Sequence, residues 1–163
     1  PEEFQKVAAM HVELLNHAVA DISPDRMRLH LCWGNYEGPH HKDVPLKEII
    51  GILLRARPAA LSFEAANPRH EHEWTVFEEV KLPEGKLLIP GVLDSTTNFI
   101  EHPELVAQRI ARYARVVGRE NVIAGTDCGF ATFADRLTVD PRIAWAKLGA
   151  MAEGARLASK QLW

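Results

Sequence analysis

Apolar and polar positions follow two patterns along the chain, helical spacing and short apolar runs. Residues 2–20 carry apolar side chains at helical spacing, with Phe4, Val7, Leu14 and Leu15 on one stripe, and predict a helix. Four short apolar runs follow, each succeeded by an amphipathic stretch. The predicted strands are 27–33, 59–67, 86–94 and 121–129, and the predicted helices that follow them are 45–58, 72–80, 102–118 and 140–161.

This strict alternation predicts the α/β class, with parallel strands covered by helices in a single domain, residues 1–163. Two architectures fit it, an open doubly wound sheet and part of a (β/α)8 TIM barrel. No glycine-rich phosphate loop follows any predicted strand, which weighs against the nucleotide-binding form of the open sheet. A whole barrel needs about 250 residues. Four βα units make half of one, so the other half is expected to be missing or supplied by another chain. The first and last strands would then have unpaired edges, which predicts self-association.

Composition narrows the range of partners. The chain has 163 residues, 47% of them hydrophobic, and a net charge of −3, so neither nucleic acid nor an anionic membrane is an expected partner. No apolar run approaches the ~20 residues that span a bilayer. The two cysteines lie in strand contexts of a sequence that resembles cytoplasmic proteins, where thiols stay reduced.

Reactive side chains collect where the predicted strands end. Parallel strands bring their carboxyl ends to one edge of a sheet, and sites are usually built there. The residues concerned are His30 and Cys32 on the first strand, Glu64 on the second, Asp94 on the third, and Asp127 and Cys128 on the fourth. The spacing of two between His30 and Cys32 places both on the same face.

One imidazole, two thiols and a carboxylate suit zinc, whereas magnesium and calcium prefer oxygen ligands. The alternative is that His30 is a hydrogen-bonded strand histidine and that Cys32 and Cys128 are small core residues. Residue types and strand positions alone leave both interpretations open.

Four segments carry a family resemblance. "HLCWGN", "LSFEAAN", "GVLD" and "GTDCGF" resemble, in this order, the carboxyl-terminal barrel of cobalamin-independent methionine synthases. They are still more similar to the short single-barrel relatives, which include the epoxyalkane:coenzyme M transferases. The resemblance implies a (β/α)8 barrel whose fifth to eighth strands are the four found here, so that the chain is the carboxyl-terminal half. It also implies a catalytic zinc with the ligands His30, Cys32, Glu64 and Cys128.

The function implied is zinc-dependent alkyl transfer to a small thiol, and Glu64 would be the exchangeable ligand. Methyl transfer to homocysteine, giving methionine, comes first because it is the best-known reaction of the family. Methionine synthases have a histidine two residues after the third-strand aspartate, where this chain has Thr96, and that departure weakens the folate version of the reaction. The alternatives are addition of a thiol such as coenzyme M to an epoxide, and a non-catalytic zinc-binding fragment.

Further candidates lie beside the predicted ligands. Asp94 and Asp127 are candidate catalytic residues, although Asp127 is also placed to bond a histidine behind the ligands or a backbone group. Asn67 and Arg69 are candidates for binding an anionic group of the substrate. The competing interpretation of "NPRHEHEW", residues 67–74, is a solvated loop, and His40 and His41 are likewise expected to be exposed.

Overall fold

The computed structural model describes residues 2–135 and 137–163. Its helices are α1 (Glu2–Ala18), α2 (Leu46–Leu53), α3 (Val76–Glu79), α4 (Pro103–Val117) and α5 (Pro141–Leu162), and its strands are β1 (Arg28–Leu31), β2 (Ala60–Phe63), β3 (Leu87–Leu93) and β4 (Gly125–Thr126). Short 3₁₀ helices lie at Pro24–Arg26, Glu71–Thr75 and Arg119–Asn121. Every predicted helix and strand is therefore present, in the predicted order.

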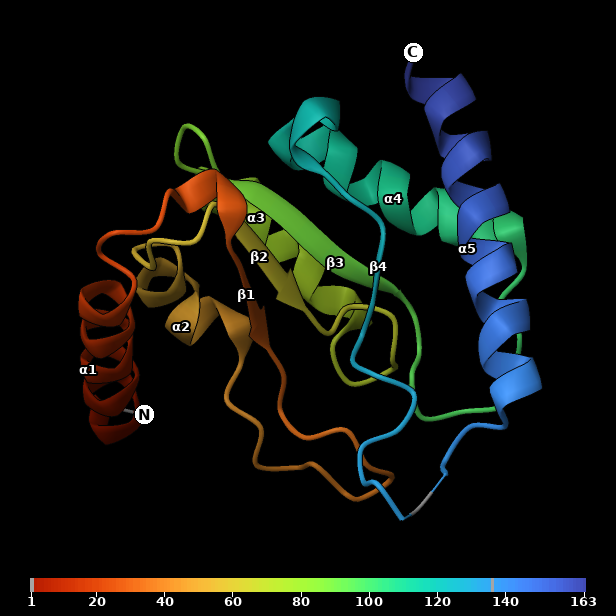
Figure 1. Ribbon diagram of the computed structural model, residues 1–163. Coiled ribbons are helices and arrows are strands. Elements are labelled where there is room, and N and C mark those ends of the chain that lie inside the picture. The colour runs from red at the N-terminus through yellow and green to blue at the C-terminus, as the bar shows by residue number, and fades with distance from the viewer. Residues whose placement is uncertain (1, 136) are drawn as a thin grey trace.

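The sheet consists of four parallel strands in the order β1-β2-β3-β4 (Figure 1). Each strand lies beside its predecessor, so the order never reverses as it does in a doubly wound sheet. Right-handed crossovers between successive neighbours then place the connecting helices on one face. This arrangement confirms the prediction of a partial (β/α)8 barrel. β1 and β4 each have one free edge, and self-association through these edges stays a prediction.

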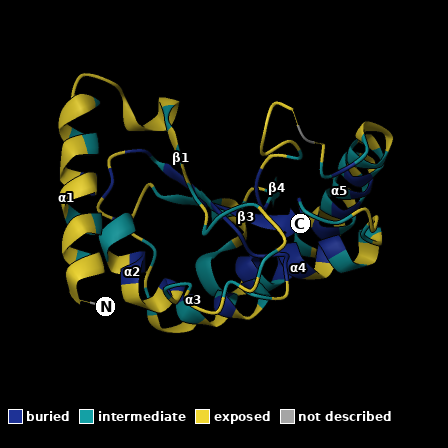
Figure 2. Cartoon of the chain, turned by 90° about the horizontal axis from the view of Figure 1, so that it is seen from below, coloured by how far each residue is buried: buried dark blue, intermediate teal, exposed yellow. Residues whose placement is uncertain are grey.

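Alternate strand residues serve the two faces of the sheet. Leu61, Phe63 and Leu88 are almost fully buried and form one core cluster beneath α2, α3 and α4. On the opposite face His30 lies beside Ser62 and Ser62 beside Ile89 in the strand register. This second face is open and lines a cavity of about 450 Å³. The buried positions of Figure 2 accordingly concentrate along β3 and the adjoining side of α4.

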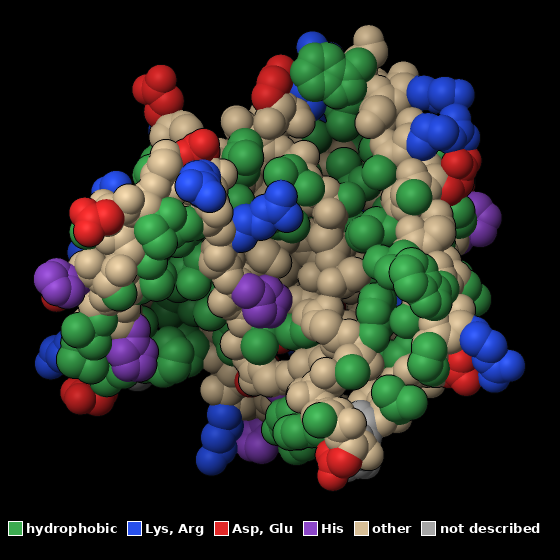
Figure 3. Space-filling model, viewed as in Figure 1, with side chains coloured by type: hydrophobic (Ala, Val, Ile, Leu, Met, Phe, Trp, Pro, Cys, Tyr) green, Lys and Arg blue, Asp and Glu red, His purple; other side chains and the backbone are tan. Residues whose placement is uncertain are grey.

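α1 packs less completely than the other long helices. Val12 is its one buried residue, whereas Phe4 is 48% exposed and Leu14 60% exposed. An apolar groove of about 300 Å³ is lined by residues of α1, β1 and α2. Figure 3 shows it as a hollow beside α1, at the left. The apolar stripe predicted from the sequence thus exists, but neighbouring elements cover only part of it.

The strands are shorter than the sequence predicts. β1 ends at Leu31, β2 ends at Phe63, and β4 contains only two residues. After Phe63 the backbone N–H groups donate to a side chain instead of to a neighbouring strand. The predicted helix 72–80 is likewise a 3₁₀ turn followed by the single turn of α3. Apart from His30 in β1, the candidate site residues therefore lie in loops just beyond the strands.

The ends of α4 follow the signals in its sequence. Pro103 is at the start, and the side chain of His102 accepts a hydrogen bond from the N–H of Glu104. Gly118 follows the last turn with φ of 91°, a backbone conformation that favours glycine. Within residues 2–135 and 137–163, no helix combines the length and the apolar character needed to cross a bilayer.

Two glycines of α5 provide a test of how tightly α4 and α5 pack. A Cβ on Gly154 would lie 2.4 Å from Val106 Cγ1 and 2.7 Å from the carbonyl oxygen of Pro103, whereas one on Gly149 would meet nothing within 4 Å. We expect Gly154→Ala to lower the free energy of unfolding by about 1–3 kcal/mol through overpacking. Gly149→Ala is the matched control and should raise it by up to about 1 kcal/mol through helix propensity. Urea unfolding of the two variants measures both, and equal effects would contradict the close packing.

Candidate metal centre

Three soft donors meet at the carboxyl edge of the sheet. One ligand atom each from His30, Cys32 and Cys128 lies within 4.8 Å of the other two. His30 is on the open face of β1, and Cys32 follows two positions later on the same side. Cys128 comes from the loop after β4 and is 8% exposed. Both cysteines are free thiols, as predicted.

Hydrogen bonds between the loops hold these donors together. The side chain of Asn35, after β1, donates to the carbonyl oxygen of Gly129 at 2.8 Å. Ser95, after β3, donates from Oγ to Asn35 Oδ1 at 2.8 Å and accepts the N–H of Cys128 at 3.1 Å. His30 Nδ1 lies 3.1 Å from Ser62 Oγ, which orients its ring. The sequence gives no signal for Asn35 or Ser95, because polar residues in turns are common.

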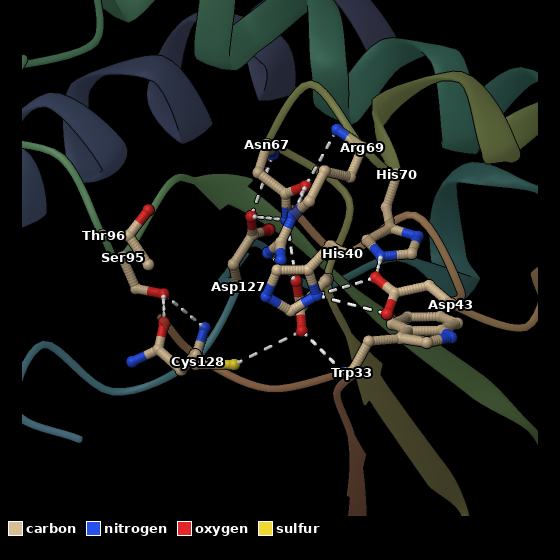
Figure 4. A network of polar contacts seen from close by, with 12 residues as sticks. Trp33, His40, Asp43, Asn67, Arg69, His70, Ser95, Thr96, Asp127 and Cys128 are labelled. Atoms are coloured by element: carbon tan, nitrogen blue, oxygen red, sulfur yellow. Dashed lines mark hydrogen bonds and ion pairs between the residues drawn. The ribbon is translucent and has the colours of Figure 1, made fainter. Parts of the chain in front are cut away.

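Glu64 lies beside this group of three and is 2% exposed. Its Oε1 is 3.9 Å from Cys128 Sγ and accepts the N–H of Trp33 at 2.8 Å. Its Oε2 accepts hydrogen bonds from Asn67 Nδ2 at 2.8 Å and from Arg69 Nη2 at 2.7 Å. The carboxylate therefore adjoins the Cys128 thiol but is directed toward other donors. Figure 4 labels its partners Trp33, Asn67, Arg69 and Cys128. Its predicted role as a fourth ligand stays a prediction.

Asp127 anchors the loop after β2, which includes Asn67. Its Oδ1 accepts the N–H groups of Ala65 and Ala66, each at 2.8 Å. Its Oδ2 accepts the N–H of Asn67 at 2.9 Å and Asn67 Nδ2 at 2.8 Å. Burial raises the pKa of this carboxyl group to about 6, while the hydrogen bonds oppose the rise. The expectation that Asp127 bonds backbone groups is confirmed, and a catalytic role stays a prediction.

The approach of Asp127 to this loop requires a glycine on β3. A Cβ on Gly91 would lie 1.9 Å from Asp127 Oδ1 and 2.8 Å from the Asp127 backbone nitrogen. The side chain crosses β3 at Gly91 to reach the loop after β2. The "PGVLD" segment therefore has a packing reason for its glycine, which the sequence alone does not reveal.

The electrostatics of the group favour a bound cation. Burial lowers the pKa of His30, and the charge of Glu64 opposes this only in part, which favours the neutral imidazole that binds metals. Burial raises the pKa of the Cys128 thiol, and Cys32 and Glu64 raise it further. Without a cation, crowding thus keeps this thiol protonated, and a metal ion would offset that repulsion. Two thiols and an imidazole are also the ligand types that zinc prefers, so the residues fit this metal.

Asp94 is half-buried in the loop after β3. Its Oδ1 accepts the N–H of Thr96 at 2.7 Å and the Thr96 hydroxyl at 2.8 Å. Its own N–H donates to Glu101 Oε1, and Glu101 forms an ion pair with the fully buried Lys147 at 2.8 Å. These contacts fix the shape of the loop. A catalytic role for Asp94 stays a prediction.

A cavity of about 290 Å³ opens among the loops that follow β1, β2 and β3. Its lining includes Tyr36, Glu37, Asn67, Arg69, Asp94 and Thr96. Both predicted substrate-binding residues and one predicted catalytic residue therefore border the same space. Within the described ranges, Arg69 Nη1 is a buried nitrogen that has no hydrogen-bond partner.

A second polar network lies behind the donors, and two expectations fail there. Trp33 stacks on His70 with ring centroids 3.9 Å apart, and His70 bonds Glu73 Oε2 at 2.9 Å and Asp43 Oδ2 at 3.3 Å. The His40 side chain is 2% exposed and pairs with Asp43 at 2.9 Å, so the expectation that it is solvated is wrong, although it holds for His41. The interpretation of 67–74 as a solvated loop is also wrong for Asn67 and His70, which are each 3% exposed, although His72 is exposed. Both expectations fail because these polar side chains form hydrogen bonds with acidic side chains inside the protein.

Comparison with known proteins supports the fold and the resemblance. No family model matches the chain. It is 24% identical over 176 residues to 2-hydroxypropyl-CoM lyase of Xanthobacter autotrophicus, an alignment that covers 93% of this chain and 45% of that protein. A B12-independent methionine synthase from Shewanella sp. W3-18-1, solved in complex with selenomethionine, superposes with a TM-score of 0.70. That match covers 93% of this chain and 43% of the synthase at 22% identity, and it shows the fold alone. The chain thus spans less than half the length of either protein, and the resemblance predicted from the sequence is confirmed.

The anchoring by Asp127 can be tested by removing one acceptor. Asp127→Asn replaces one carboxylate oxygen by an amide nitrogen, so at least one buried donor in 65–67 loses its partner. We expect a loss of about 1–3 kcal/mol in the free energy of unfolding. Hydrogen exchange at the amides of Ala65, Ala66 and Asn67 should accelerate. Asp21→Asn, at an exposed position, is the control. If Asp127→Asn changed the free energy of unfolding and the exchange rates no more than this control, the anchoring role of Asp127 would be contradicted.

His70 predicts a pH dependence of stability. Burial lowers its pKa, but the bonds and charges of Glu73 and Asp43 outweigh this, so the pKa is raised. Its stabilising contribution is therefore complete below its unfolded pKa of about 6.5 and is lost as the pH rises through the raised folded value. The difference in unfolding free energy between the wild type and His70→Gln should shrink across this range in urea titrations. His72→Gln, at an exposed position, is the control, and a constant difference for His70→Gln would refute the assignment.

Proposed function

We propose that this chain carries the zinc-binding half of a thiol alkyltransferase. His30, Cys32 and Cys128 hold the metal, and Glu64 is the fourth, exchangeable ligand. The observation that carries the proposal is the meeting of three donor atoms within 4.8 Å of one another, with the Glu64 carboxylate 3.9 Å from Cys128 Sγ. The two similar proteins, a methionine synthase and a CoM lyase, are named for products or substrates of sulfur chemistry and support this class.

Each element of the site has a part in such a reaction. Bound zinc lowers the pKa of a thiol and so favours the nucleophilic thiolate. Ser62 orients the His30 ring, and Ser95 holds the backbone of Cys128, so the donor atoms are positioned before the metal arrives. The cavity on the open face, which His30 and Cys128 line, gives the substrate a place beside them, and Asn67, Arg69 and Asp94 border a second cavity. Arg69 Nη1, which has no partner among the described residues, is available to an anionic group of that substrate.

Methyl transfer to homocysteine is the first choice of reaction, and thiol addition to an epoxide is the second. Thr96 stands where methionine synthases have a histidine, and its hydroxyl is already bonded to Asp94. This favours a donor that does not need a proton from that position. A zinc-binding fragment without activity is the remaining alternative, because the chain spans less than half of the proteins it resembles.

The metal assignment predicts about one zinc ion per chain in protein purified under reducing conditions. Cys32→Ala and Cys128→Ala should each weaken zinc binding strongly. The loss should exceed the roughly 10–100-fold that follows removal of a residue that only hydrogen-bonds a metal ligand. His41→Ala, an exposed histidine beyond the same strand, is the control and should keep its zinc. Elemental analysis and competition with a chromophoric chelator measure both quantities.

X-ray absorption spectra distinguish an active alkyltransferase from an inactive zinc-binding fragment. An alkyltransferase should exchange one oxygen neighbour of zinc for one sulfur when homocysteine or coenzyme M is added. Zinc that stays unchanged with both thiols would favour the inactive fragment. Protein that contains no zinc would overturn the proposal.

A further inference from the structure

Glu64 has a complete set of hydrogen-bond partners in addition to the nearby Cys128 thiol. Both carboxylate oxygens are occupied, Oε1 by the N–H of Trp33 and Oε2 by Asn67 and Arg69. The contact with Arg69 is an ion pair at 2.7 Å, in which the Glu64 side chain is 1% exposed and the Arg69 side chain 23% exposed. Charge-assisted bonds to a carboxylate with such limited exposure are among the stronger polar contacts in proteins. This site gives both oxygens of the Glu64 carboxylate hydrogen-bond partners without a metal ion.

The groups that receive Glu64 are themselves fixed in place. Asn67 Oδ1 accepts the N–H of Arg69 at 3.0 Å and Arg69 Nε at 3.1 Å, which orients the guanidinium group. Asn67 Nδ2 also donates to Asp127, and its N–H does the same. The receiving site is therefore rigid and coupled to the loop that carries Cys128. It is not a chance contact between two mobile surface side chains.

We propose that Arg69 and Asn67 form a holding site for the Glu64 carboxylate, which it occupies whenever a substrate thiol takes its place at the metal. In holding Glu64 both serve as positioning residues, separately from the contact with the substrate that is proposed for Arg69 Nη1. This inference rests on the proposed function. Glu64 Oε1 lies 3.9 Å from Cys128 Sγ, so the carboxylate is next to the donor group even while it is held.

The holding site lowers the free energy needed for a thiol to replace the Glu64 carboxylate at the metal. A carboxylate that leaves a metal ion inside a protein becomes a buried, unpaired charge unless another cation receives it. Glu64 is 2% exposed, so water cannot take this part. Arg69 supplies the positive charge, and Asn67 and Trp33 supply neutral donors on the two oxygens. The arrangement lowers the free energy of the form that accepts the thiol.

This energy balance has a signature that distinguishes holding from simple structural support. Removing the holding site destabilises the form in which Glu64 is off the metal, so thiol binding must weaken. The same change deprives Glu64 of its alternative partner, so zinc binding without thiol must become tighter. The two affinities therefore move in opposite directions, whereas damage to the fold weakens both.

The test compares Arg69→Met with the wild type, both as the full zinc-loaded chain. Calorimetric titration with L-homocysteine and with 2-mercaptoethanesulfonate gives the thiol Kd, and competition with a chromophoric chelator gives the zinc Kd without thiol. We expect the thiol Kd of Arg69→Met to rise about tenfold or more, the range for a lost bond to a charged group. The zinc Kd should fall. Arg69→Lys keeps the charge without the planar fork and should show a smaller change of the same signs.

Arg142→Met is the matched control, since the Arg142 side chain is 90% exposed and, among residues 2–135 and 137–163, pairs only with Asp140 near the start of α5. It should leave both affinities unchanged. An Arg69→Met protein that binds thiol as the wild type does, or that loses affinity for both thiol and zinc, would overturn the holding site. Should Arg69→Met not fold, Arg69→Lys decides by the same two signs. Failure of the proposed function is seen separately, as a wild type that binds no zinc or shows no response to either thiol.

Discussion

The carboxylate of Asp127 is the contact on which the arrangement of the site depends. It accepts four hydrogen bonds, three from the backbone N–H groups of 65–67 and one from the Asn67 side chain. These N–H groups therefore do not pair with a neighbouring strand, and the end of β4 is joined to the loop after β2. The contact spans β3 only because Gly91 has no side chain. It places Cys128 beside Glu64, and through Asn67 it also orients Arg69. One buried anion thereby determines where the candidate ligands and the cavity beside them lie.

Much of the fold follows from the sequence because apolar periodicity is a local property. Each helix and strand forms near its predicted position, and the pairing of successive strands follows from parallel crossovers. Strand ends were harder to predict, because a backbone N–H of Ala65 can bond either a neighbouring strand or Asp127, which is 62 residues away. The burial of His40 was missed for a similar reason. Its partner Asp43 also receives His70, and nothing in the local sequence shows that these side chains meet.

The candidate site was predictable to the extent that residue type determines chemistry. His30, Cys32 and Cys128 are soft donors at strand ends, and the structure brings them within 4.8 Å of one another. The partners of Glu64 could not be predicted, since a carboxylate next to two thiols can equally well be directed toward a metal or toward an arginine. The structure shows the second arrangement, with Arg69 at 2.7 Å. Long-range partner choice, more than residue identity, is what the sequence leaves open.

The candidate metal ligands and the cavities near them differ in how completely these residues enclose them. The candidate ligands come from segments at β1, β2 and β4. Their supporting contacts come from Asn35, Ser62, Ser95 and Asp127, so the loop after β3 also takes part. The cavity beside them is bordered by only three loops, and the inner face of the sheet is open. A barrel closes that face with further strands, whose loops converge on the same edge. The three donors that could hold a metal therefore lie entirely within these residues, whereas the space beside them is open on the side that a complete barrel encloses.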